Sequence, residues 1–129
     1  MSSAQRVRLI SREAGSAVTV YRVVTQAADG QVDHVADATE KPLGIAAESV
    51  STVGQAVPVA TEGSGILKVE AAAAISVGAE LEAAGDGTGR VITHTSGLAD
   101  YRLGTALSAA GAAGDIIEVQ LLVSLDEVV

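Results

Sequence analysis

An internal repeat restricts the possible folds of this chain more than any other feature of its sequence. Residues 43–46 (LGIA) recur sixty positions later as residues 103–106 (LGTA). Ten residues after each of their glycines the chain reads GQAVPV at 54–59 and GDIIEV at 114–119. A repeat of this length indicates a duplicated supersecondary unit that shares a core with its copy.

The same offset, extended in both directions, defines two units that run roughly from 6 to 60 and from 66 to 120. It pairs Leu9 with Val69. A chain of 129 residues fits one domain, and neither half is large enough to be stable alone, so we expect one joint core. We expect an extended N-terminal arm over residues 1–14 and a single β domain over residues 15–129.

The local sequence favours short strands joined by glycine turns. Residues 17–24 are rich in β-branched side chains and lead into Asp29-Gly30, a strong hairpin signal, and residues 79–84 lead into a similar glycine-rich turn. The stretches with helical composition are cut short by glycine, and the chain contains 14 glycines. The predicted class is all-β, a small barrel or sandwich built from the two units.

The last strong strand shows the period of two that one buried face produces. We expect four residues to face the core: Ile117, Val119, Leu121 and Val123. Ile116 and Leu122 then point outward, where they suit a contact between subunits. Pro58 stands where the second unit has Glu118, and because proline cannot donate to a ladder, the first copy of this strand is predicted at a sheet edge.

Charge is unevenly distributed along the chain. Sixteen acidic and eight basic residues give a formal charge of −8, which disfavours nucleic acid and anionic membranes as direct partners. Arg6, Arg8 and Arg12 nevertheless precede the first acid, Glu13. This basic segment is either a solvated terminus or an arm that docks on an acidic partner surface.

Several functional classes lack their sequence signatures. There is no cysteine, which excludes disulfides and thiolate sites, and no apolar run or secretory signal directs the chain to a membrane. We therefore expect a soluble protein made in the cytosol.

Candidate chemistry is sparse. His34 and His94 each stand ten residues before a repeat glycine, and with Asp33 or Asp37 they invite a metal hypothesis. A zinc site needs three or four converging donors, so duplicated surface residues are the preferred interpretation. Glu80 and Glu82 fit a solvated strand face better than an acid and base pair. We expect no catalysis, no metal and no cofactor.

In order, the chain shows a basic arm and two β units that close on Leu-Gly-x-Ala and Gly-x-x-[Val/Ile]-x-Val. A hairpin turn in each unit ends in Gly-[Gln/Arg]-Val. These features resemble the small capsid cement or head-decoration proteins of tailed bacteriophages, most closely at residues 101–107 and 113–121. The resemblance covers nearly the whole chain, although its motifs are structural glycines and apolar strand residues.

The resemblance implies a β-rich homo-oligomer, a dimer or trimer, made in the bacterial host cytoplasm and located on the outer capsid surface of the virion. It would bind the major capsid protein, bridge neighbouring capsomers and stabilise the expanded shell. The alternatives are a β module that serves as a tail or baseplate adaptor or binds a small ligand, and a hydrolytic enzyme built on His34 or His94.

The resemblance carries no site motif, so partner-binding residues are inferred from the arm and the outward strand positions. The candidates are Arg6, Val7, Arg8, Leu9, Ile10, Arg12, Ile116 and Leu122. An exposed segment such as 7–10 would add a strand to a neighbour's sheet. Deleting residues 1–14 is accordingly expected to leave a folded oligomer that no longer binds expanded heads.

Overall fold

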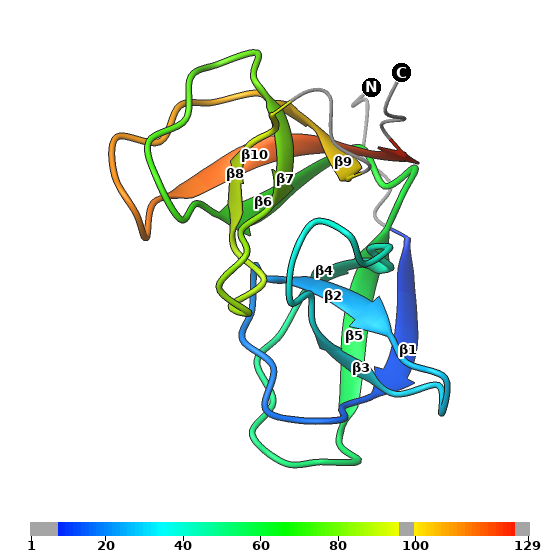
Figure 1. Cartoon of the computed structure of the whole chain (residues 1–129). Coiled ribbons are helices and arrows are strands. Elements are labelled where there is room, and N and C mark those ends of the chain that lie inside the picture. Colours follow the sequence, from blue (N-terminus) through cyan, green and yellow to red (C-terminus); the bar gives the residue numbers. More distant parts are fainter. Residues whose placement is uncertain (1–7, 96–99, 126–129) are drawn as a thin grey trace, which may run out of the picture.

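The computed structural model describes residues 8–95 and 100–125, and within these ranges it contains strands and no helix (Figure 1). The first unit, in the lower part of Figure 1, consists of β1 (Leu9–Glu13), β2 (Val23–Gln26), β3 (Val32–His34), β4 (Gly44–Ala46) and β5 (Ala56–Thr61). The second unit, above it, consists of β6 (Ile66–Glu70), β7 (Glu80–Ala83), β8 (Val91–Thr93), β9 (Tyr101–Ala106) and β10 (Ile116–Leu125).

Each unit forms one antiparallel sheet, and the two sheets have the same strand order. The first is β1-β5-β4-β2-β3 and the second is β6-β10-β9-β7-β8. In each sheet a single parallel bridge joins the two edges, Ala14 to Val32 and Ala71 to Val91. One bridge is not a ladder, so the sheets do not form closed barrels. The all-β prediction is confirmed. It allowed a small barrel or a sandwich, and the structure is sandwich-like.

The sixty-residue offset is wrong for the first strand of each unit. Ile10 lies opposite Val59, and Leu67 lies opposite Val119, so these strands correspond at an offset of 57 residues. The glycine of the repeat motif does keep the offset of sixty. Three additional residues between β7 and β9 account for the difference. Short aliphatic strands carry no side chain that marks their register, which is why the sequence alignment missed the shift.

The strand predicted over residues 17–24 begins later than expected. Only Val23 and Val24 of that range lie in β2, because Tyr21 has a left-handed backbone with φ of 66° that interrupts an extended chain. Gly78 occupies the same place in the second unit, with φ of 88°. Both residues donate their N–H to equivalent carbonyls, those of Ala46 and Ala106.

The buried residues form two clusters where one joint core was expected. The smaller cluster fills the inside of the first unit with Ala14, Val18, Val24, Val32, Ala46, Val50, Val57 and Val59. Their counterparts by strand register fill the second unit: Ala71, Ile75, Leu81, Val91, Ala106, Ala110, Ile117 and Val119. This larger cluster also includes four residues of the first unit, Val23, Val35, Ile45 and Ala60, so it joins the two units.

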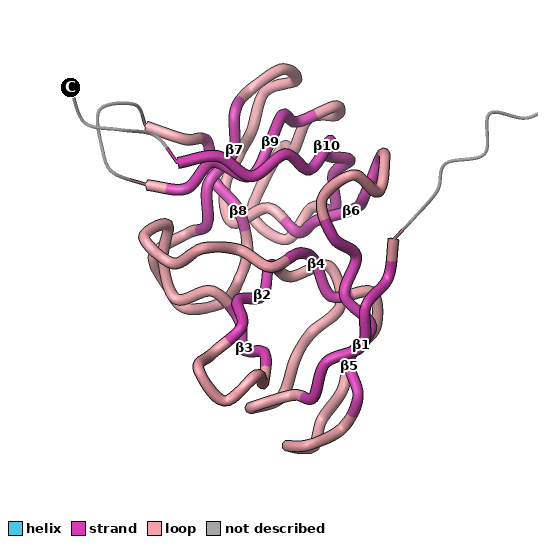
Figure 2. The backbone as a smooth tube through the Cα atoms, turned by 90° about the vertical axis from the view of Figure 1, so that its right-hand side faces the viewer, coloured by secondary structure: helices cyan, strands magenta, loops and turns pink. Residues whose placement is uncertain are grey.

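The units meet where β4 lies against β6 (Figure 2). Polar contacts fasten them from the start of β2 to the end of β6 and the turn between β7 and β8. The Arg22 guanidinium donates to both carboxylate oxygens of Glu70 at 3.2 Å and to the Thr88 carbonyl at 2.9 Å. The Val23 N–H donates to the Gly89 carbonyl at 2.7 Å. A Cβ on Gly89 would lie 2.6 Å from the Val23 carbonyl oxygen, so only glycine permits this approach.

The edge position predicted for Pro58 is wrong. Its strand, β5, lies between β1 and β4. The Pro58 carbonyl accepts the Ala47 N–H at 2.9 Å, so the missing proline N–H faces a residue just beyond the end of β4 at Ala46. Proline is tolerated in this inner strand because the ladder has already ended there.

The predicted faces of the last strand are confirmed. Ile117, Val119 and Leu121 are buried, and Val123 packs partly buried against the larger cluster. Ile116 and Leu122 are exposed.

Two long connections project away from the body of the sandwich. One joins β4 to β5, and the other, orange in Figure 1, joins β9 to β10. Residues 51–56 and 111–116 are exposed throughout. Each connection ends in a left-handed glycine, Gly54 or Gly114, and no other described group lies within 4 Å of a Cβ built there.

Candidate partner-binding surface

The segment predicted as an arm is in part a strand of the sheet. Residues 9–13 form β1 and pair with β5, and Ala14 is fully buried in the smaller cluster. Alternating side chains explain this, because Ile10 packs against that cluster while Leu9 points outward. Arg6 and Val7 lie outside the described residues.

The structure does not gather the predicted contact residues into one patch. Arg8 and Leu9 lie at the start of β1, where Leu9 is 54% exposed, and Arg12 donates to the neighbouring Ser11 carbonyl at 2.9 Å. Ile116 and Leu122 share the outer face of β10 but stand six residues apart, roughly 20 Å along a strand. Two separate surfaces therefore carry the candidates: the β1 edge and the outer face of the second sheet.

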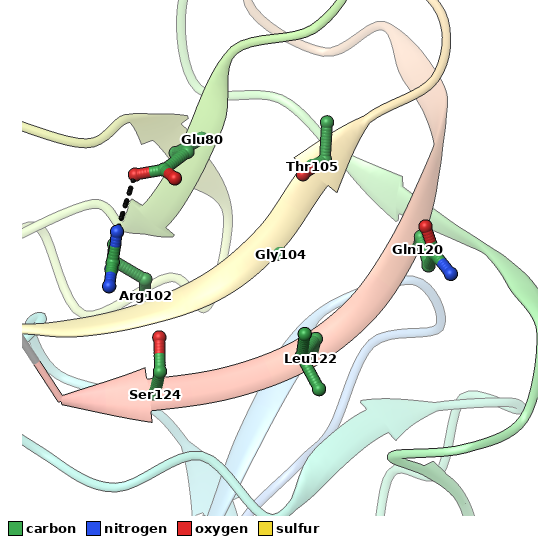
Figure 3. Close-up of a pocket in the computed structure, with 7 residues that line it drawn as sticks. All are labelled: Glu80, Arg102, Gly104, Thr105, Gln120, Leu122 and Ser124. Atoms are coloured by element: carbon green, nitrogen blue, oxygen red, sulfur yellow. Dashed lines mark hydrogen bonds and ion pairs between the residues drawn. The ribbon is translucent and has the colours of Figure 1, made fainter.

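The outer face of the second sheet contains a hollow of about 230 Å³ (Figure 3). Its lining comes from three adjacent strands: Glu80 of β7, Arg102, Gly104 and Thr105 of β9, and Gln120, Leu122 and Ser124 of β10. Arg102 Nη1 donates to Glu80 Oε2 at 2.9 Å, and this ion pair bridges β7 and β9. Leu122 is 64% exposed and adds an apolar side chain to an otherwise polar surface.

The shape of the hollow follows from Gly104 and from a bulge in β10. A Cβ on Gly104 would lie 1.9 Å from the Gln120 carbonyl oxygen, so the absent side chain lets β9 and β10 approach closely. The pairing of β10 with β9 shifts by one residue between Leu121 and Ser124. A bulge of this kind bends and twists a strand, and here it coincides with the outward Leu122.

The polar members of this surface were not among the predicted contact residues. Glu80 was predicted together with Glu82, both on a solvated strand face. The structure instead buries Glu82, which bonds His94 Nδ1 at 2.8 Å and accepts the Thr95 N–H at 3.1 Å. The Leu-Gly-x-Ala motif itself was the available signal, since Thr105 replaces Ile45 at its third position.

The two histidines occupy different positions in their units. Val24 lies opposite His34, but its counterpart Leu81 lies opposite Thr93, so the two histidines are not equivalent. His34 Nε2 accepts the Thr19 N–H at 3.0 Å, whereas His94 bonds Glu82. Within residues 8–95 and 100–125, no three His, Asp or Glu side chains are placed to hold a metal ion.

His34 has an altered acidity. Burial lowers its pKa, the nearby Arg22 guanidinium lowers the pKa further, and the Asp33 carboxylate opposes the shift. The neutral imidazole is thus favoured, which matches its role as acceptor for the Thr19 N–H.

Comparison with protein families matches the phage cement protein family over residues 4–121. The chain belongs to the phage cement protein family. It is accordingly a structural protein of phage capsids, as the resemblance in its sequence implied. Comparison with curated proteins finds no match. In the part of the chain that the structure describes, no helix is long and apolar enough to cross a bilayer.

A solved structure shares the fold of this cement protein. The base of the head fiber protein gp8.5 of bacteriophage phi29 superposes with a TM-score of 0.70 at 21% identity. The match covers 90% of this chain and 94% of that chain, so both sheets take part.

Proposed function

We propose that this cement protein binds the outer surface of a phage head as a homo-oligomer, bridges neighbouring capsomers and stabilises the expanded shell. The family match over residues 4–121 carries the proposal, because it spans nine whole strands of the two sheets and the first part of β10. The major capsid protein is the proposed partner. The role requires binding alone, without catalysis or a cofactor.

The physical basis of such a role is multivalency. Each subunit offers a small contact, but an oligomer that touches several capsomers gains effective concentration with every contact it makes. Many copies distributed over a shell then resist its deformation together. A sandwich fastened by a shared core and the Arg22–Glu70 pair transmits force between its two surfaces as one body.

The small-ligand alternative has less support. Small-molecule sites are usually enclosed pockets of roughly 300–1,000 Å³ with mostly apolar walls. The hollow beside Glu80 and Arg102 is only about 230 Å³ and lies open on the face of a sheet, which suits a contact with a protein better. A role as tail or baseplate adaptor remains the alternative that an experiment must separate.

Co-sedimentation separates these roles. Purified protein is mixed with expanded heads, unexpanded proheads or isolated tails, and the pelleted protein is quantified. We expect saturable binding to expanded heads and a higher temperature of head disruption. Binding to tails alone, or no effect on head disruption, would contradict the proposal.

The contribution of the N-terminal segment needs a shorter deletion than 1–14. That deletion would remove β1 and the buried Ala14, so loss of binding would only report a damaged sheet. Deletion of residues 1–7 removes Arg6 and Val7 and retains β1. We expect a folded protein with weaker head binding, and unchanged binding would exclude these two residues from the contact.

A further inference from the structure

Within the chain, the first unit contacts β6, the edge strand of the second sheet, through a backbone hydrogen bond. The Glu70 N–H donates to the Tyr21 carbonyl at 2.9 Å, and the left-handed conformation of Tyr21 presents that carbonyl. Beside this bond, Ala47 of the first unit and Ile66 of the second line the same small hollow. We call Tyr21 with its outward carbonyl the first hook.

The second unit contains the same structure without a partner unit on it. Gly78 has the matching φ of 88°, and its N–H donates to the Ala106 carbonyl at 2.8 Å, just as Tyr21 donates to Ala46. No described group lies within 4 Å of a Cβ built on Gly78. Val77, next to it, is 65% exposed, and Leu107, the counterpart of Ala47, is exposed as well. We call Gly78 the second hook.

Among the described residues, no other unit lies on the edge of β1, which corresponds to β6, and only the Ala14–Val32 bridge joins that edge to another strand. The Thr61 N–H donates to the Arg8 carbonyl and the Ala14 N–H donates to the Gln55 carbonyl, which shows which residues of β1 face β5. Since the bonds of an antiparallel ladder alternate, the N–H groups of Leu9, Ser11 and Glu13 point away from β5. None of these three bonds another backbone group within the described ranges. By strand register Glu13 corresponds to Glu70, whose N–H donates to the carbonyl of the first hook.

We propose that two copies of this protein associate head to tail, with the second hook of one copy docked on the β1 edge of the next. The Glu13 N–H of one copy then donates to the Gly78 carbonyl of the other, as Glu70 does to Tyr21 within the chain. This proposal supplies the interface of the homo-oligomer on which the proposed function rests. Its test does not depend on head binding.

The side chains around the two surfaces are complementary. Exposed Leu9 corresponds to Ile66, and exposed Leu107 corresponds to Ala47, so the contact joins two apolar side chains. Arg8 on the β1 side meets a face that carries exposed Glu118 and Glu80. Each copy uses two different surfaces, so copies join in a row that closes into a ring when the rotation allows.

Two variants of the full chain test the proposal. Glu13→Pro removes the N–H that donates to the Gly78 carbonyl of the other copy. It leaves the β1–β5 bonds intact, because that N–H points away from β5. Glu13→Ala is its matched control and keeps the N–H. Val77→Glu places a charge beside the second hook. Native mass is measured by size exclusion with light scattering, and circular dichroism checks that each variant is folded.

We expect an oligomer for the wild type and for Glu13→Ala, and a monomer for Glu13→Pro and for Val77→Glu. An equal mixture of the two monomeric variants is expected to form dimers and nothing larger, because each retains one intact surface. A monomeric wild type, or oligomers that survive both changes, would overturn the proposal. So would a dimer lost only in Glu13→Pro, which indicates two-fold pairing of β1 with itself.

Discussion

The two units have the same strand order, but their outer faces differ in burial and polarity. In the first unit this face carries Val23, Ile45 and Ala60, all buried under the second unit. The register places Glu80, Thr105 and Gln120 at the same positions of the second unit, where they line an open hollow. Each of these three positions is therefore a core position in the first unit and a surface position in the second.

This difference explains why the chain covers the outer face of its first unit and leaves that of its second unit open. An apolar outer face requires another unit on top of it, and the first unit has one. The polar outer face of the second unit is stable in water, so it is free for a separable partner. Gly104 and the β10 bulge give that face its shape, whereas Arg22 holds the buried face of the first unit in place.

Gly104→Ala is expected to have the largest effect. The new Cβ would lie 1.9 Å from the Gln120 carbonyl oxygen at a φ of 134°, so β9 and β10 must separate, at a cost of about 3 kcal/mol or more in unfolding free energy. Gly114→Ala is the matched control, with positive φ but no described group near its Cβ position, and should cost only about 1 kcal/mol. Urea unfolding measures both, and equal losses would show that the close strand approach is unimportant.

Arg22→Met tests the contact between the units. It leaves the partly buried Glu70 carboxylate without its two 3.2 Å bonds, and we expect a loss of about 2 kcal/mol in unfolding free energy. Arg12→Met is the control, because the Arg12 side chain donates to the adjacent Ser11 carbonyl and should change stability by less than about 0.5 kcal/mol. A loss no larger than that of the control would mean that the shared apolar cluster and the backbone bonds between the units hold them together without this ion pair.

The smallest expected effect concerns His34 and pH. Its pKa is lowered in the folded state, so the unfolded chain binds the proton more readily, and the stabilisation is complete above the unfolded value near 6.5. Stability is then lost as pH falls from about 6.5 toward the folded pKa. His34→Gln keeps an acceptor for the Thr19 N–H and removes this titration. Thermal unfolding of both proteins between about pH 7 and 5 should show a steeper decline for the wild type.

Local sequence rules predicted the parts of the fold that depend on one strand at a time. The alternation from Ile116 to Val123 gave the correct faces of β10, and the Asp29-Gly30 turn gave a correct hairpin. The rules failed where a distant contact decides the outcome. Tyr21 interrupts a strand to reach β6, and Pro58 is permitted by where β4 ends.

The candidate surface was less predictable for the same reason. The outward direction of Leu122 was predictable, because the alternation of buried and exposed residues along a strand can be read from its sequence. The roles of Glu80 and Glu82 depend on which neighbour lies beside each, Arg102 in one case and His94 in the other. Residues 7–10 were predicted as an exposed contact segment of an arm, but the pairing of β1 with β5 depends on residues nearly fifty positions away.

The two projecting connections described above offer a practical use. Foreign peptides placed at Val53 or Gly111 would extend into solvent from backbone that lies outside both sheets, so the fold should accept them. A shell coated with such fusions would display an antigen or an enzyme in a dense, regular array, at two sites per molecule that can be loaded independently.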